Sequence, residues 1–230
     1  MQKIESFESL VAHLKEVDGS YAKSSLEAYF YKHAYTGSSF ENFCGKDHNK
    51  FTADDIVAVS MLSVKIPPSA SRWILGDGQK CLTKLLKELD PKLTIQDPKA
   101  DLTIGKTAWN LWKEIHSLRG VGETMASKLL AAKRPLLFPI FDQHVARALK
   151  LTPDCYWEPW QKFMRSENGT KGGEIVQQMA ADLGKPELST LRLLDVVIWM
   201  QQHGHKSITP ELVNKGMMIN VNYSPQRCPK

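Results

Sequence analysis

The stretch IHSLRGVGETMASKLLAAKRPLLFPIFDQHVARALK, residues 115–150, decides the fold that we expect for this chain. Its apolar residues recur at helical spacing on both sides of Leu118-Arg119-Gly120-Val121-Gly122. This pattern predicts two antiparallel helices joined by a short turn, with the second helix beginning at about Glu123. Glycine accepts a positive φ and lets another backbone approach closely, so two glycines around one valine suit a tight turn.

The turn before the second helix is a candidate phosphate-binding site. The first amides of a helix have no intrahelical partner and carry partial positive charge, so phosphate oxygens bind well there. The candidate contacts are Gly120, Val121, Gly122, Thr124 and Lys128, with Lys133 and Arg134 as further positive charges. A site of this kind would hold the DNA backbone without reading its sequence. The GxG pattern taken alone is more typical of a plain loop between two packed helices.

A second motif, FDQHVAR (141–147), follows at a short distance. Pro135 and Pro139 interrupt the helical pattern before it, because proline lacks the amide that a helix interior needs. Asp142 then falls at the start of the next helix, where an N-terminal carboxylate is favoured. The residues alone leave two interpretations open: a plain N-cap, or a carboxylate that takes part in chemistry.

The two motifs in register resemble the helix-hairpin-helix DNA glycosylase superfamily, which includes endonuclease III and the adenine glycosylase MutY. The matching residues are Leu118, Gly120, Val121, Gly122 and Ala126, then Asp142, His144, Val145 and Arg147. The resemblance covers residues 104–204 and implies an all-α, two-lobed fold with the active site in the cleft between the lobes. It implies that Asp142 is the catalytic carboxylate and that His144 and Arg147 orient and support the site.

The resemblance also suggests how the chain divides. Residues 1–50 and 142–230 would form one helical lobe from both termini. Residues 51–141 would form a central helical bundle that ends in the helix-hairpin-helix, 115–133. The stretches YTGSSFENF (35–43) and FTADDIVAVSMLSV (51–64) resemble a poorly characterised bacterial family that carries the same hairpin.

The chain departs from the superfamily in two places. Bifunctional members carry a Schiff-base lysine two residues after the second glycine, where this chain has Thr124. We therefore expect hydrolytic base removal without efficient strand cleavage, with Lys128, one turn later, as a less favoured substitute. The four cysteines, Cys44, Cys81, Cys155 and Cys228, are scattered and contain no CxxC pair, so no metal, iron–sulfur cluster or other cofactor is expected.

Four residues are candidates for a pocket that would hold an extruded base. Tyr35, Phe40 and Glu41 come from a Gly- and Ser-containing loop, which is a common place for binding groups. Trp109 is a further candidate, but it stands at i, i+3 to Trp112, a spacing that is also typical of core residues.

The rest of the chain also reads as helical, and strand signals are almost absent. Helices are predicted at 6–17, 24–34, 52–64, 68–75, 78–89, 104–118, 156–166, 173–184 and 189–204, and the tail after Gly216 is predicted to be irregular. The net charge of +5 suits a nucleic-acid partner, though weakly. With no signal peptide and no apolar run of about 18 residues, we expect a cytoplasmic, nucleoid-associated monomer of bacterial origin.

The sequence therefore predicts a monofunctional DNA glycosylase that flips a damaged or modified base and excises it by hydrolysis. It would act in base-excision repair or in defence against modified phage DNA. The alternative is a non-catalytic helix-hairpin-helix module that binds DNA and does no chemistry.

Overall fold

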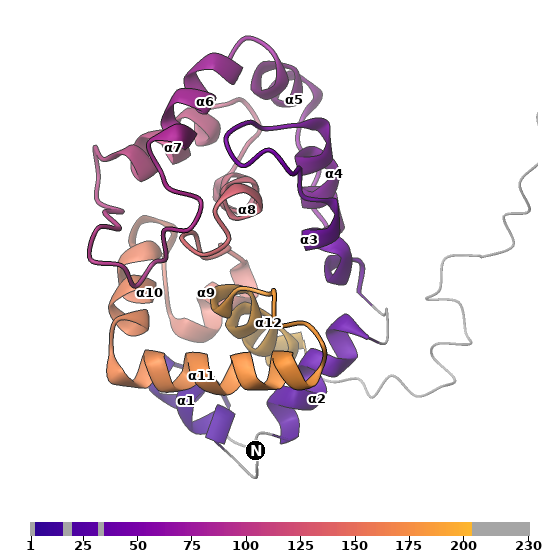
Figure 1. Cartoon of the computed structure of the whole chain (residues 1–230), viewed down its shortest axis with the longest axis vertical. Helices are drawn as coiled ribbons and strands as arrows, with labels where there is room; N and C mark the ends of the chain where they lie inside the picture. Colours follow the sequence, from indigo (N-terminus) through magenta and orange to yellow (C-terminus); the bar gives the residue numbers. More distant parts are fainter. Residues whose placement is uncertain (1–2, 16–19, 32–34, 204–230) are drawn as a thin grey trace, which may run out of the picture.

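The computed structural model of this chain describes residues 3–15, 20–31 and 35–203 (Figure 1). These residues form α-helices and short 3-10 helices and contain no strand, which confirms the predicted all-α fold class. The α-helices are α1 (Phe7–Lys15), α2 (Ser20–Phe30), α3 (Phe40–Phe43), α4 (Ala53–Met61), α5 (Pro68–Leu75), α6 (Gln79–Lys87), α7 (Thr107–His116), α8 (Glu123–Lys133), α9 (Gln143–Leu149), α10 (Trp157–Met164), α11 (Glu167–Asp182) and α12 (Thr190–His203). The 3-10 helices are η2 (Thr36–Ser39) and η3 (Pro153–Cys155).

Helices from opposite ends of the sequence pack side by side. α12 packs against α2, α9 and α11, and α1 packs against α11, so the two N-terminal helices lie with the C-terminal ones (Figure 1). The middle of the sequence forms a second set, in which α8 packs against α4 and α7, and α6 packs against α5 and α7. α3 and η2 pack against α4. The connection between α8 and α9 therefore links one set of helices to the other.

Local sequence signals fix where several helices begin. α4 begins after Thr52, whose amide donates to the carboxylate of Asp55 at 2.7 Å. Pro68 opens α5, where its missing amide costs nothing. Ser166 caps α11, because its hydroxyl accepts from the amide of Gly169 at 3.1 Å. These caps satisfy amides that the helix itself leaves without a partner.

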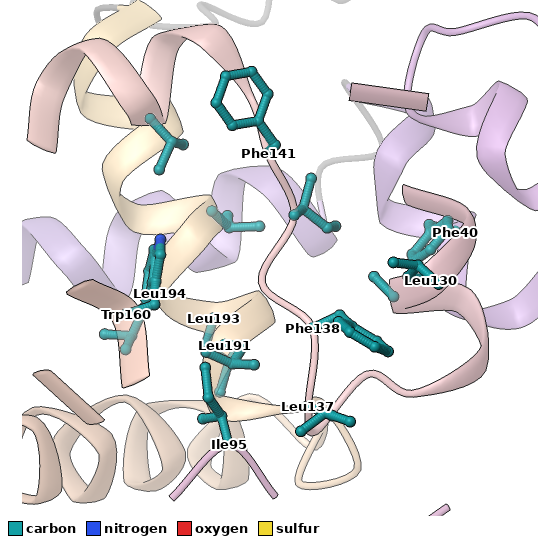
Figure 2. Packing of buried hydrophobic residues seen from close by; sticks show 14 of the residues in the cluster. Phe40, Ile95, Leu130, Leu137, Phe138, Phe141, Trp160, Leu191, Leu193 and Leu194 are labelled. Atoms are coloured by element: carbon teal, nitrogen blue, oxygen red, sulfur yellow. The ribbon is translucent and has the colours of Figure 1, made fainter. Parts of the chain in front are cut away.

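Helix α8 lies within the core, since every residue from Ala126 to Lys133 is buried. The segment after α8 adds Leu137, Phe138 and Phe141 to the core. Figure 2 shows this segment passing between Leu130 of α8 and the α12 leucines. Burying apolar side chains of this size contributes about 1.5–3 kcal/mol each, so this packing holds the start of α9 firmly in place.

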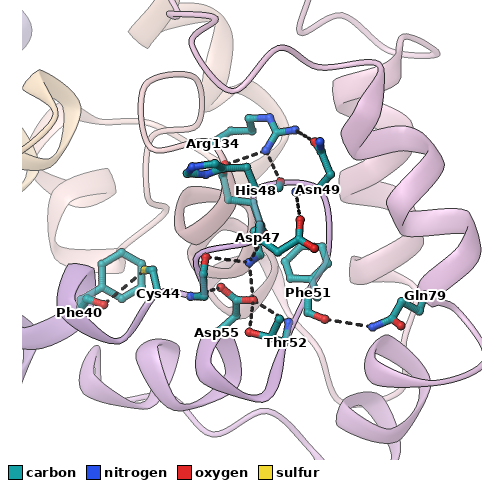
Figure 3. Close-up of polar contacts among 12 residues, drawn as sticks. Phe40, Cys44, Asp47, His48, Asn49, Phe51, Thr52, Asp55, Gln79 and Arg134 are labelled. Atoms are coloured by element: carbon teal, nitrogen blue, oxygen red, sulfur yellow. Dashed lines mark hydrogen bonds and ion pairs between the residues drawn. The ribbon is translucent and has the colours of Figure 1, made fainter.

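A buried ion pair ties the first turn of α4 to the end of α8. Nζ of Lys133 lies 2.6 Å from the carboxylate of Asp55, and neither side chain has exposed surface. The same Nζ donates to the carbonyl of Gly45 at 3.3 Å. Arg134 is fully buried next to it and donates to the backbone carbonyl of His48 and to the side-chain carbonyl of Asn49 (Figure 3). It also donates to the backbone carbonyl of Leu89 at 2.8 Å. The prediction that Lys133 and Arg134 add charge to a phosphate site is therefore wrong, because both hold internal loops.

The helix boundaries differ most from the sequence prediction in three places. α2 begins at Ser20 rather than residue 24, and the predicted loop 35–40 forms η2 and the start of α3. α11 begins at Glu167 rather than residue 173 and includes Gly172, whose added Cβ would lie 3.5 Å from Leu14. Close packing against α1 thus overrides the low helix propensity of glycine. The predicted irregular tail and Cys228 lie outside the described residues.

Among the helices that the structure describes, none is long and apolar enough to cross a membrane.

Candidate functional site

The turn between α7 and α8 places its glycines in different conformations. Gly120 has a φ of +82°, which is the left-handed region that favours glycine. Gly122 is extended, with φ −97° and ψ −179°, and a Cβ added there would meet no atom within 4 Å. The turn therefore needs a glycine at Gly120 for its backbone shape, whereas Gly122 leaves open space in front of α8.

The amide of Val121 is already engaged inside this turn, since it donates to the carbonyl of Leu118 at 2.9 Å. Val121 is also buried, so the prediction that it contacts phosphate does not agree with its surroundings. The amides of Glu123 and Thr124 stand at the first positions of α8, where a helix offers no partner. These amides and the open face at Gly122 are the part of the turn that suits an anion.

A pocket of about 660 Å³ opens close to this turn and is lined by residues from both sets of helices. That volume falls within the range of about 300–1,000 Å³ that is usual for small-molecule sites. Five residues that the sequence singled out line it together: Tyr35, Thr124, Lys128, Asp142 and His144. They come from three segments of the chain, namely the residue before η2, helix α8 and the start of α9, so the fold has brought them to one place.

Asp142 serves as the N-cap of α9 and also lines the pocket. Its backbone is extended, and Oδ1 accepts from the amide of His144 at 2.8 Å, which confirms the predicted N-cap position. Capping engages one carboxylate oxygen and fixes the side chain rotamer. The cap and a chemical role are therefore compatible, because a half-buried carboxylate held in this way presents its charge to the pocket.

Lys128 lies inside the pocket, one turn of α8 after Thr124. Its side chain is buried, and Nζ donates to the carbonyl of Leu62 at 2.8 Å. Burial lowers the pKa of Lys128, while the charges of Asp142 and Asp195 oppose that shift. The prediction of a phosphate contact beside the turn is therefore wrong for Lys128, whose amine faces the pocket and its carboxylates.

Aromatic side chains form one wall of the pocket, which we call the aromatic wall: Tyr29, Tyr35, His144, Trp199 and His203. Tyr35 stacks on Tyr29, with ring centroids 5.3 Å apart, and meets Trp199 edge-on at 5.4 Å. His203 stacks on Trp199 at 3.8 Å and also contacts His144 at 4.2 Å. Burial, followed by the charge of His144, lowers the pKa of His203, which favours the neutral ring. Faces and edges of this kind suit a flat aromatic ligand.

Arg192 of α12 lines the pocket and hydrogen-bonds to several residues around it. Nε donates to Glu41 at 2.8 Å, one terminal nitrogen donates to Asp195 at 2.9 Å, and the other donates to the Tyr29 hydroxyl at 2.9 Å and to the Gly37 carbonyl. Burial lowers the pKa of Arg192, but Tyr29, Glu41 and Asp195 more than offset this, so the pKa is raised. One buried cation thus joins α2, η2 and α3 to α12.

Four predicted site residues lie elsewhere. Phe40 is buried against the Arg192 guanidinium, 5.7 Å from ring to cation, and Glu41 is paired with the same arginine rather than lining the pocket. Arg147 is exposed on α9. Trp109 lines a separate aromatic pocket of about 450 Å³ with Trp112 and Trp157. Trp109 therefore does not share a pocket with Asp142.

The sequence analysis missed four residues of α12: Arg192, Asp195, Trp199 and His203, all of which line the pocket. A signal for two of them exists, because Arg192 and Asp195 stand at i, i+3 inside the otherwise apolar run LRLLDVVI. Buried charges almost always have a partner, so such a pair indicates a polar site within a core.

Residues 22–202 match a family of unknown function, DUF6308. The chain belongs to that family. The matched range contains the whole turn between α7 and α8, Asp142 and the Arg192–Asp195 pair. No curated protein and no solved structure matches the chain.

Proposed function

We propose that this chain is a DNA glycosylase that flips a base into the pocket and hydrolyses its N-glycosidic bond, with Asp142 as the catalytic carboxylate. One observation carries the proposal. The carboxylate of Asp142 lines the same pocket as the aromatic wall and as Thr124, a residue of the first turn of α8. A nucleotide whose phosphate bound at the start of α8 would therefore have its base within reach of an aromatic pocket and a fixed carboxylate.

The chemistry follows from the charge of the transition state. When the bond between C1′ and the base nitrogen breaks, positive charge develops on the deoxyribose. A preorganised carboxylate stabilises that charge and can take a proton from the attacking water. Thr124 stands where a nucleophilic lysine would be needed for a covalent intermediate, and a threonine cannot form a Schiff base. Water is then the nucleophile, and the product is an abasic site.

The packing of the helices supports a two-lobed reading of the fold. One set of helices contains α1, α2, α9, α11 and α12, and the other contains α4 to α8. Because the pocket takes residues from both sets, it suits a cleft that opens between them. The turn at Gly120 and Gly122 is the feature that we assign as the helix-hairpin-helix. It would hold the backbone of a duplex while one nucleotide is extruded.

Base release tests the proposal. Wild-type protein is incubated with duplexes that carry damaged or naturally modified bases, including phage DNA, and abasic sites are revealed with hot alkali. Strand breaks that require alkali are expected. A different result would assign a lyase step to Lys128. In that case strands break without alkali, borohydride traps a covalent protein–DNA complex, and Lys128→Met abolishes this complex. Salt-sensitive binding without any base release would favour the non-catalytic DNA-binding module.

Gly122→Val is expected to weaken DNA binding about tenfold. The valine side chain would fill the open face at Gly122 and keep a phosphate from about one charge-assisted hydrogen bond with the backbone amides. The substitution leaves the fold intact, because Gly122 is extended and its side chain would enter open space. Fluorescence anisotropy on duplex DNA at several salt concentrations measures the change. Ala181→Val, an exposed position on α11, is the control. Equal affinity for wild type and Gly122→Val would remove the start of α8 from the DNA contact.

A further inference from the structure

The pocket contains a second carboxyl group, that of Asp195, besides the carboxylate of Asp142. Asp195 of α12 lines the pocket and is 6% exposed. Its Oδ2 accepts from Arg192 at 2.9 Å, while its Oδ1 is buried and has no hydrogen-bond partner in the described structure. A buried polar oxygen without a partner is costly unless it is protonated or meets a donor from a ligand.

The groups around Asp195 come from every helix that packs near it. On α12 itself Arg192 faces it, Asp142 faces it from α9, and Lys128 faces it from α8. α2 contributes the Tyr29 hydroxyl through Arg192. α11 meets α12 through the neutral amide of Gln177, which donates to Thr190.

Glu41 and Tyr156 also interact with Asp195, at longer range. Glu41 shares Arg192 with Asp195, so the arginine is not available to one carboxylate alone. The buried phenol of Tyr156 is also coupled to Asp195, but it donates to the carbonyl of Ile140 at 2.6 Å.

Burial raises the pKa of Asp195 to about 7, helped by the charge of Asp142 and opposed by Arg192 and Lys128. The two carboxylates of the pocket thus differ in environment. Asp142 caps a helix in a half-buried position, and Asp195 is enclosed. An enclosed carboxyl group beside a second carboxyl group in a different environment is a usual arrangement for a general acid.

We infer that Asp195 is the general acid that protonates the departing base, and that the enzyme therefore excises bases that are neutral in DNA. This inference rests on the proposed function and names the substrate class of that same site. The carboxyl group of Asp195, which lines the pocket, gives its proton to a ring nitrogen or carbonyl oxygen of the flipped base. The C1′–N bond then breaks and its electron pair goes to the base.

The remaining steps balance the reaction. The protonated base leaves as the neutral compound, and water adds to C1′ and loses a proton to Asp142. Solvent then takes that proton from Asp142 and returns one to Asp195. A base that is already cationic, such as 7-methylguanine, carries the positive charge that the acid would supply. Its departure gains nothing from Asp195.

The test uses the full chain and duplexes carrying one neutral base (adenine, hypoxanthine, 8-oxoguanine, uracil or 5-hydroxymethylcytosine) or the cationic 7-methylguanine. Single-turnover release is measured from pH 5 to pH 9 for wild type, Asp195→Asn and the control Asp54→Asn, an exposed position on α4. Asparagine keeps the hydrogen bond from Arg192 and the side-chain volume. Thermal unfolding of each variant verifies the fold.

Wild-type release of a neutral base should fall as the pH rises through about 7, where Asp195 loses its proton. Asp195→Asn should slow this release by about 10²- to 10⁴-fold and remove the decline at high pH, and any release of 7-methylguanine should be unchanged. Neutral-base release by Asp195→Asn at the wild-type rate and with the wild-type pH profile would overturn the inference and leave the glycosylase proposal standing. Release of 7-methylguanine alone by wild type would do the same. A wild type that releases none of these bases would contradict the proposed function itself, and with it this inference.

Discussion

Asp142→Asn is expected to lower base release by about 10²- to 10³-fold, which is the usual effect of removing one preorganised electrostatic group from an active site. The carboxylate of Asp142 lines the pocket and is fixed by its bond to the amide of His144. Asparagine is as good an N-cap as aspartate, so α9 should keep its start while the pocket loses a negative charge. Single-turnover release from a duplex that wild type cleaves is the measurement.

The control for Asp142→Asn separates charge from folding. DNA affinity and the midpoint of thermal unfolding should stay near the wild-type values, because the cap is retained. Release at the wild-type rate would move the catalytic carboxylate away from Asp142. An equal loss of activity and of thermal stability would leave Asp142 with a capping role alone.

Arg192→Met is expected to lower the free energy of unfolding by about 3–5 kcal/mol, the typical cost of removing one partner from a buried ion pair. At pH 8, above the pKa of about 7 of Asp195, the substitution leaves the carboxylates of Glu41 and Asp195 buried without their cation, and it removes the donors to Tyr29 and Gly37. For a chain of this size the midpoint of thermal unfolding should fall by about 10 °C. Differential scanning calorimetry measures both quantities.

A matched pair of variants tests the reason for this loss. Arg72→Met, at an exposed position of α5, should change the midpoint little. Adding Glu41→Gln and Asp195→Asn to Arg192→Met should recover part of the stability, because no unpaired charge is then buried. Wild-type stability in Arg192→Met would show that the Arg192 network does not hold α12 to α2 and α3.

Local signals in the sequence predicted most of the helix starts. Thr52 before two aspartates, Pro68 and Asp142 each stand directly before or at the start of a helix in the structure. The prediction started α11 too late, at residue 173, whereas the helix already includes Gly172. Gly172 packs against Leu14 of α1. A contact of that kind joins segments far apart in the sequence and leaves no local pattern.

The candidate site was only partly predictable for a similar reason. Asp142, Thr124 and Tyr35 each carry a recognisable local pattern, and the fold places them in one pocket. Lys133, Arg134 and Lys128 were predicted to add positive charge near a phosphate, yet their partners are backbone carbonyls and a carboxylate from segments far away in the sequence. Asp195 and Trp199 fall in an apolar helical segment, and the sequence pattern does not show which face of that helix lines a pocket. The three-dimensional structure shows this face of α12.

The central claim, that Asp142 faces a sugar carrying positive charge, has a direct test that does not depend on knowing the base. Two duplexes are compared, one with a cationic pyrrolidine and one with a neutral tetrahydrofuran in place of the same nucleotide. Wild-type protein should bind the pyrrolidine duplex about 10²-fold more tightly, as expected of a transition-state analogue, and Asp142→Asn should lose that preference. Equal affinity of wild type for the two duplexes would contradict the assignment of Asp142 to glycosidic bond cleavage.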